Sequence, residues 1–331
     1  MADIKKVVVA GGGVLGSQIA LQTAYWGYDV TIWLRSEGSI GRCQPKLDKF
    51  EQQYLEAIEG MKGAASAKDA AWCPGIADFG SFDADECAAR AKAAHDGMKL
   101  ELDLAKAVAD ADLVIESMAE VAEQKAEFFK KVAPLMPEKT IIVTNSSSLL
   151  PSQFTKDTGR PDRYLALHFA NSIWKHNMTE VMVQSETSDA SFQAVLDFAR
   201  GIHMDPLPVK KEKAGYLLNS QLVPWMLSGL DLLANGISDP RSIDKAWTEG
   251  TGAPKGPFQV FDTVGLTTAM NIVEQYQKVP GIVSPLLRKM MMPYNFKGMK
   301  AILQRYIDEG KLGMAAGEGF YKYDENGDII L

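Results

Sequence analysis

Short runs of apolar residues alternate with longer amphipathic segments in the N-terminal part of the chain. Lys5 to Ala10 leads into consecutive valines and predicts a buried strand. Glycines follow, and Val14 to Trp26 then shows the apolar periodicity of a helix. Asp29 to Leu34, with its β-branched residues, predicts a second strand. A strand, a glycine turn, a helix and a strand within about 30 residues form a βαβ unit.

The alternation resumes after a long region with helical composition. Gln44 to Ala109 is rich in Ala, Lys, Glu and Asp, which favours helices with turns near Pro74-Gly75 and Asp96-Gly97. Further strands are predicted at 113–116, 140–144, 164–168, 180–184 and 207–210, and further helices at 123–133 and 190–200. Strands that alternate with helices are typical of a parallel sheet, so we expect a Rossmann-type α/β domain.

The pattern after Lys213 predicts helices only. The expected helices cover 217–235, 243–249, 266–276 and 299–309. We therefore expect two domains: a Rossmann-type dinucleotide-binding domain at residues 1–211, followed by an all-α domain at residues 212–331.

Composition narrows the class of protein. With 331 residues, 46% hydrophobic and 23% charged, the chain resembles an ordinary globular protein. Its longest apolar runs fall far short of the roughly 20 residues that a membrane span needs. The net charge of −7 disfavours nucleic acid or an anionic membrane as a partner. An anionic small molecule stays compatible, because the stretch 210–213 is locally basic.

Cysteine and histidine spacing argues against a metal site. The three cysteines have no CxxC spacing, and the four histidines have no HExxH spacing. A reducing compartment is the natural interpretation of the cysteine usage. The first predicted strand follows Met1 so closely that no room is left for a signal or transit peptide. We therefore expect a cytoplasmic protein without a metal.

The glycine-rich turn indicates a dinucleotide site. In "VVVAGGGVLGSQIA", Gly11, Gly13 and Gly16 have GxGxxG spacing between a predicted strand and helix. The first glycine permits a tight turn, the second lets the main chain approach a pyrophosphate, and the third lets the helix pack closely. The phosphates would meet free N–H groups at the helix N-terminus, near Val14 and Leu15.

Motifs further along the chain are specific enough to indicate a family. They are "TNSSSL" (144–149), "LHFAN" (167–171), "TEVM" (179–182), "GYLLNSQLVP" (215–224), "GAPKGPFQVFDTVGL" (252–266) and "GEGFYKY" (317–323). The motifs occur in this order along the chain, and with them the sequence resembles the L-3-hydroxyacyl-CoA dehydrogenase family over most of its length. The resemblance implies hydride transfer between a nicotinamide and carbon 3 of a 3-hydroxyacyl-CoA or 3-oxoacyl-CoA, and a homodimer formed through the C-terminal domain.

The resemblance also implies roles for single residues. His168 matches the family's acid/base, and Glu180 matches the carboxylate that orients it. Ser147 and Asn219 match the neutral donors to the reacting oxygen. The positions expected to contact the cofactor, including six outside the glycine turn, are Gly11, Gly13, Val14, Leu15, Gly16, Leu34, Arg35, Ser36, Glu120, Lys125 and Asn145.

The sequence departs from the family after the histidine. The family motif HFFNP is replaced by His168-Phe169-Ala170-Asn171-Ser172, followed by a bulky, polar stretch at 173–177. The loss of proline removes a fixed φ, and this stretch is expected to reshape the pocket beside the base. A related dehydrogenase of a CoA-free 3-hydroxyacid, such as a carnitine-like or sugar-acid substrate, therefore stays open. A non-catalytic nucleotide-binding protein is the remote alternative, because both His168 and Glu180 are present.

The end of the second predicted strand bears on the choice of cofactor. In "VTIWLRSE", Leu34 takes the place of the acidic residue that would bind the adenosine ribose and repel a 2′-phosphate. Arg35 and Ser36 offer donors suited to a phosphate. NADP(H) is therefore favoured over NAD(H). In the alternative, Arg35 only flanks the adenine and Glu37 contacts the ribose.

Overall fold

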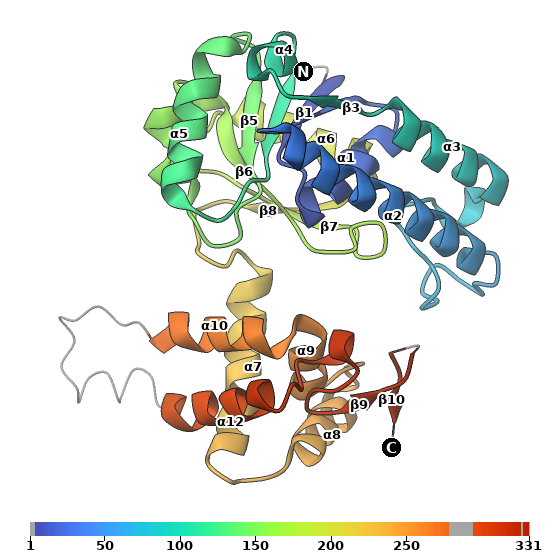
Figure 1. Ribbon diagram of the computed structural model, residues 1–331, viewed down its shortest axis with the longest axis vertical. Helices are drawn as coiled ribbons and strands as arrows, with labels where there is room; N and C mark the ends of the chain where they lie inside the picture. Colours follow the sequence, from blue (N-terminus) through green and yellow to red (C-terminus); the bar gives the residue numbers. More distant parts are fainter. Residues whose placement is uncertain (1–3, 278–293, 326, 331) are drawn as a thin grey trace. The chain divides into compact units, whose positions relative to one another are not determined.

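The computed structural model describes residues 4–277, 294–325 and 327–330. The chain divides into two compact units, residues 1–217 and 218–331. The division falls a few residues beyond the boundary expected from the sequence. Figure 1 shows a sheet flanked by helices in the first unit and a group of helices in the second. This architecture confirms the predicted fold class.

Within the described residues, the first unit is built on an eight-stranded sheet with the order β3-β2-β1-β4-β5-β6-β7-β8. The strands are β1 (Lys6–Ala10), β2 (Asp29–Trp33), β3 (Lys99–Glu101), β4 (Leu113–Glu116), β5 (Ile141–Thr144), β6 (Tyr164–Phe169), β7 (Met178–Met182) and β8 (Asp205–Val209). Strands β1 to β6 pair in parallel, β7 runs antiparallel to β6, and β8 is parallel to β7. Six parallel strands thus precede a reversal at β7.

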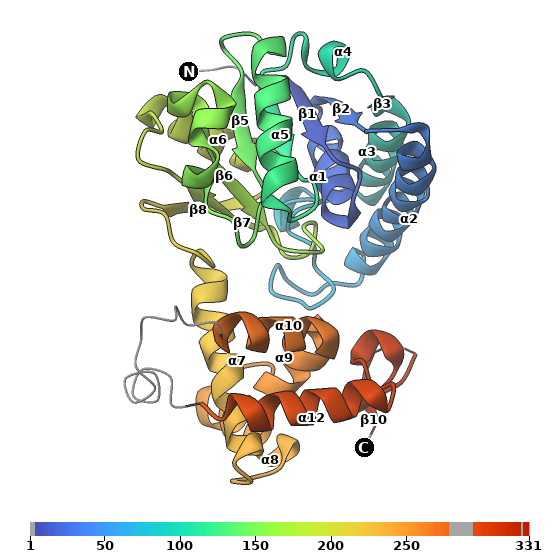
Figure 2. The same ribbon diagram turned by 60° about the vertical axis from the view of Figure 1, so that its left-hand side comes forward.

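Helices cover both faces of the sheet, as Figure 2 shows for α1 and α5. The helices are α1 (Val14–Tyr25), α2 (Glu37–Met61), α3 (Ala84–Gly97), α4 (Leu104–Val108), α5 (Ala122–Val132) and α6 (Asp189–Gly201). Val7 and Val9 of β1 face one core with α1, α2, α3 and α6, whereas Val8 and Ala10 face a second core with α4 and α5. Burial on both faces explains the continuous valine run in β1.

Three strands of the first unit differ from the prediction by two residues or more. One of them, predicted at 207–210, begins at Asp205 and ends at Val209. The short strand β3 lies inside the segment expected to be helical, where it pairs with β2 at the edge of the sheet. Its three residues are too few to show alternation. The strand predicted at 180–184 begins at Met178 instead and ends at Met182, because its residues pair with β6 and β8 over that range.

The second unit is mainly helical. Its helices are α7 (Leu218–Ala234), α8 (Pro240–Thr251), α9 (Pro257–Val264), α10 (Leu266–Gln277) and α12 (Phe296–Asp308), and a small antiparallel hairpin joins β9 (Lys322–Tyr323) to β10 (Ile329–Ile330). The sequence predicted neither α9 nor the hairpin. No helix of the described residues is both long and apolar enough to cross a membrane.

A buried carboxylate explains one of the C-terminal motifs as a structural feature. Asp262 of α9 accepts hydrogen bonds from the backbone N–H groups of Phe320 (2.8 Å) and Tyr321 (2.9 Å). A Cβ on Gly319 would lie 2.1 Å from an Asp262 carboxylate oxygen, so only glycine fits there. Burial raises the pKa of Asp262, and these hydrogen bonds partly oppose the rise. The stretch "GEGFYKY" is thus tied to α9 by a buried acid.

Candidate active site

A cleft of about 660 Å³ opens above the carboxyl ends of the central strands in the first unit. Its volume lies within the range of about 300–1,000 Å³ typical of small-molecule sites. Of the residues expected from the sequence to bind a cofactor, those that line it are Gly11, Gly13, Val14, Leu15, Gly16, Leu34, Arg35, Glu120 and Asn145. Ser147 also lines it, while Ser36 and Lys125 are not among its described wall residues. Further lining residues, not singled out from the sequence, are Gly12, Trp33, Ser39, Arg42, Lys46, Ser117, Met118, Ala119 and Ser148.

The three motif glycines each meet a different spatial demand. Gly11 has a φ of 122°, and a Cβ there would lie 2.5 Å from the carbonyl oxygen of Ser117. A Cβ on Gly16 would lie 2.1 Å from the Gly11 carbonyl oxygen. Around Gly13, in contrast, no described atom lies within 4 Å of an added Cβ, and this open side belongs to the cleft. A pyrophosphate could therefore approach the N-terminus of α1 at Gly13.

His168 and Glu180 are direct partners across the antiparallel strands β6 and β7. Side chains of such a pair project from the same face at close range. His168 Nδ1 lies 2.9 Å from Glu180 Oε2, and Glu180 is fully buried. An ionised carboxylate only accepts hydrogen bonds, so Nδ1 carries a proton and Nε2 is left to exchange one. The strand pairing thus gives a meaning to the spacing of these residues, which the sequence alone did not.

The loop after β5 brings Ser147 to the other side of the imidazole. Ser147 Oγ lies 3.0 Å from His168 Nε2. Next to it, Asn145 Oδ1 accepts a hydrogen bond from the Phe169 N–H at 3.0 Å. The loop is therefore attached to β6 beside the histidine, and Ser147 connects the imidazole to the wall of the cleft.

A buried ion pair is connected to the loop that carries Ser147. Lys125 Nζ lies 2.6 Å from Glu116 Oε1 and 3.4 Å from Glu120 Oε2, and the Lys125 side chain is 1% exposed. Glu120 in turn accepts hydrogen bonds from the Ser146 hydroxyl and from the N–H of Ser148 (2.9 Å). These hydrogen bonds and Lys125 lower the pKa of Glu120, although burial opposes them. Lys125 therefore contacts a residue that lines the cleft, Glu120, without lining the cleft itself.

Basic side chains gather where β2 ends. Leu34 is buried, and the exposed Arg35 lines the cleft together with Ser39, Arg42 and Lys46 of α2. Positions 39, 42 and 46 are three and four residues apart, so they share one face of the helix. That spacing was the sequence signal that could have found Arg42 and Lys46. Ser36 is the N-cap residue of α2.

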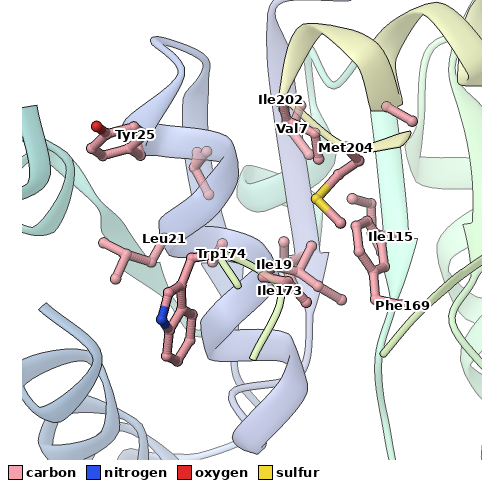
Figure 3. Packing of buried hydrophobic residues seen from close by; sticks show 14 of the residues in the cluster. Val7, Ile19, Leu21, Tyr25, Ile115, Phe169, Ile173, Trp174, Ile202 and Met204 are labelled. Carbon is pink, nitrogen blue, oxygen red and sulfur yellow. The ribbon is translucent and has the colours of Figure 1, made fainter. Parts of the chain in front are cut away.

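Two side chains of the segment that departs from the family motif are packed into the core. Ile173 and Trp174 are buried, and the Trp174 ring lies 5.1 Å from that of Tyr54 on α2. Figure 3 shows the side chains of Ile173 and Trp174 close to those of Ile19 and Leu21 on α1. A Cβ on Gly75 would lie 2.8 Å from the Trp174 Cα, so residue 75 must be small. The bulk of this segment thus fills the space between α1 and α2.

Asn219, the second predicted donor, lies in the first turn of α7 and is half-buried. It belongs to the second unit, whereas His168, Glu180 and Ser147 belong to the first. Its role stays a prediction. Among the residues that the structure describes, no group of three or more His, Cys, Asp or Glu side chains is placed to hold a metal ion.

The site fits a nicotinamide dinucleotide. The open side of Gly13 suits a pyrophosphate, and a carboxylate-oriented histidine adjoins the same cleft through Ser147. Together, a glycine-rich cleft and a histidine able to move a proton define the class of nicotinamide-dependent dehydrogenases.

Comparison with known proteins agrees with this class and narrows it. Residues 6–213 match the model of the 3-hydroxyacyl-CoA dehydrogenase NAD binding domain, and residues 215–323 match that of the C-terminal domain. The chain belongs to the 3-hydroxyacyl-CoA dehydrogenase family.

Individual relatives are similar over nearly the whole chain. Human mitochondrial hydroxyacyl-coenzyme A dehydrogenase is 29% identical over 320 residues, covering 97% of this chain and 91% of the relative. The 3-hydroxybutyryl-CoA dehydrogenase of Clostridioides difficile is 26% identical over 324 residues, covering 97% and 100%. Among solved structures, a diketoreductase described as acting on dicarbonyl compounds is 43% identical with a TM-score of 0.80, covering 98% of this chain and 100% of that chain.

Proposed function

We propose that the protein transfers a hydride between NADP(H) and carbon 3 of a 3-oxoacyl-CoA or 3-hydroxyacyl-CoA, with His168 as the acid/base. The observation that carries the proposal is the arrangement at His168. Glu180 lies 2.9 Å from Nδ1, and Ser147 lies 3.0 Å from Nε2 beside the dinucleotide cleft. A nicotinamide-dependent oxidation of an alcohol needs a base at this place, and reduction of a ketone needs an acid.

Each residue of the proposed site has a separate role in the reaction. When bound, NADPH supplies the hydride for the carbonyl carbon. His168 donates the proton on Nε2 to the oxygen that becomes the hydroxyl group. Glu180, held at Nδ1, stabilises the charge of the imidazolium and fixes the ring. The hydroxyl of Ser147 is a neutral donor to the same oxygen, and Asn219 is the proposed second donor.

The test of the proposed function compares substrates in one assay. We expect purified protein to reduce acetoacetyl-CoA with NADPH at a kcat/KM of about 10⁴ M⁻¹ s⁻¹ or more, the usual lower bound for enzymes on good substrates. Free acetoacetate and an unconjugated diketone are measured beside it by the loss of NADPH absorbance. No turnover of any ketone with either cofactor would refute the proposal.

The second candidate is a reductase of CoA-free dicarbonyl compounds or 3-oxo acids. It is favoured by the similarity to the diketoreductase at 43% identity over 98% of this chain. The departure at 170–177 from the family motif agrees with a different substrate. Turnover of free ketones, with acetoacetyl-CoA inactive, would establish this candidate over the first.

The basic residues that line the cleft support the preference for NADPH. Arg35, Arg42 and Lys46 line the same end of the cleft, and Leu34 replaces the acid that would repel a phosphate. Arginine offers a planar fork of donors that matches phosphate oxygens. Glu37, the alternative ribose contact, is exposed at the start of α2 and is not among the described residues that line the cleft.

Removing the arginines should shift the cofactor preference. We expect Arg35→Ala and Arg42→Ala each to raise the KM for NADPH about tenfold, as loss of a charge-assisted hydrogen bond to phosphate would. The KM for NADH should change little, because NADH lacks the 2′-phosphate. The exposed Arg200, which is on α6 and pairs with Asp197, provides the control variant Arg200→Ala. A wild-type preference for NADH that neither arginine variant alters would disprove the NADPH assignment.

A homodimer formed through the second unit and a cytoplasmic location are also proposed. The resemblance to the family supports the dimer. Large apolar side chains exposed on the second unit agree with a subunit contact there; examples are Leu232, Ile237, Trp247 and Leu312.

A further inference from the structure

A buried tyrosine lies flat against the proposed catalytic histidine. The rings of Tyr216 and His168 are stacked, with centroids 4.5 Å apart and an angle of 16° between the planes. Tyr216 is 2% exposed, and it lies two positions before Leu218, the first residue of α7. One face of the imidazole is thereby covered by an aromatic ring rather than by solvent.

The same tyrosine also contacts the loop that carries Ser147. The Tyr216 hydroxyl donates a hydrogen bond of 2.7 Å to the carbonyl oxygen of Ser146. Burial, followed by the charge of Glu180, raises the pKa of the phenol, so Tyr216 stays a neutral donor at any working pH. The residue therefore connects the face of the imidazole to the backbone next to Ser147.

The backbone around Tyr216 completes the contact with the carboxylate. The N–H of Leu217 donates a hydrogen bond of 2.7 Å to Glu180 Oε1, the oxygen that does not face His168. Tyr216 has a φ of 50°, in the left-handed region that tyrosine seldom adopts. Such conformations persist where surrounding contacts impose them, often at functional sites.

We propose that Tyr216 is a positioning residue that sets the ring plane of His168 and the place of Ser147 at the same time. The inference rests on the proposed function of this site. Glu180 contacts Nδ1, Ser147 contacts Nε2, and Tyr216 covers one face of the ring. The imidazole is therefore held at both nitrogens and on one face. A charged imidazolium is also stabilised by the π-face of an aromatic ring.

Two variants separate the ring from the hydroxyl. Tyr216→Phe keeps the stack and removes the hydrogen bond to Ser146, so kcat should fall about tenfold, as expected when a buried carbonyl loses its donor. Tyr216→Leu removes the stack as well, and kcat should fall about a hundredfold because the base is no longer held in place. The KM for NADPH should stay within a factor of about two for both, since positioning acts on the chemical step.

A second readout does not depend on turnover. Leucine has no π-face to stabilise the charged ring, so Tyr216→Leu should move the titration midpoint of His168, followed by NMR, to lower pH by about half a unit. Tyr216→Phe should leave the midpoint near that of the wild type. The decline of the reduction rate at alkaline pH should move in the same direction, because reduction needs the charged imidazolium.

Tyr164 provides matched controls. It is a fully buried tyrosine at the start of β6, and its hydroxyl has no hydrogen-bond partner among the described residues. We expect Tyr164→Phe and Tyr164→Leu to change thermal stability without changing kcat or the titration of His168. Tyr216 variants that lose stability while keeping wild-type kcat and titration would overturn the positioning role and leave the proposed function intact. A wild-type protein inactive on every ketone would instead overturn both.

Discussion

Replacing His168 with glutamine is expected to lower kcat for ketone reduction by about a thousandfold, the usual contribution of a general acid/base. Glutamine is similar in size and can accept a hydrogen bond, but it has no proton to give at neutral pH. The KM for NADPH should change little, because His168 is not among the described residues that line the dinucleotide cleft. The measurement is steady-state kinetics at saturating acetoacetyl-CoA, or at the best free ketone.

His176 serves as the control for this variant. It lies eight positions along the chain from His168 and is exposed, and no role in the reaction is proposed for it. We expect His176→Gln to retain wild-type kcat. Reductase activity that survives in His168→Gln at more than a tenth of the wild-type rate would show that another group moves the proton.

Replacing Glu180 with glutamine should have an effect of similar size, although the two side chains are nearly isosteric. Both carboxylate oxygens are used: Oε2 faces His168 Nδ1 and Oε1 accepts from the N–H of Leu217. An amide has only one acceptor, so it cannot satisfy both donors. If it turns its NH₂ group toward Nδ1, the proton of the neutral imidazole moves to Nε2, and the wrong tautomer faces the substrate. Loss of this kind has cost about 10⁴-fold in a serine protease triad.

The second prediction has its own internal comparison. Glu186→Gln removes the same charge at an exposed position and should leave the rate unchanged. Glu180→Gln should reduce kcat by at least about a hundredfold, with little change in the KM for cofactor. The idea fails if Glu180→Gln turns over at the wild-type rate with an unaltered dependence on pH.

The strong elements of the fold followed from the apolar pattern. Strands buried on both faces, such as β1 and β4, show as continuous runs of branched aliphatic residues, and both were predicted. The edge strand β3 has the sequence Lys-Leu-Glu, which carries no such signal. It becomes a strand only because β2 offers an unpaired edge. The strands of the C-terminal hairpin have two residues each, which is too short for any apolar pattern to show.

The residues of the candidate site also differ in how far the sequence alone could predict them. The glycine turn was predicted from local spacing, because the GxGxxG pattern between a strand and a helix is contained in one short stretch of the chain. The pairing of His168 with Glu180 came from the resemblance, since their spacing has a meaning only once β6 and β7 are known to run antiparallel. Tyr216 was quoted within a motif but given no role, because its stack on His168 joins segments far apart in the chain.

Because β7 runs antiparallel to β6, the register of these two strands decides whether Glu180 lies opposite His168. Successive residues of a strand point to opposite faces, so a slip of β7 by one residue would carry Glu180 away from His168 altogether. The hydroxyl of Thr179 helps to prevent such a slip, because it donates a hydrogen bond of 2.6 Å to the carbonyl of His168. Because the strand pairing itself holds the two proposed catalytic side chains opposite each other, the connecting segment 170–177 is not needed to align them. Substitutions within 170–177 should therefore leave the pairing of His168 with Glu180 intact.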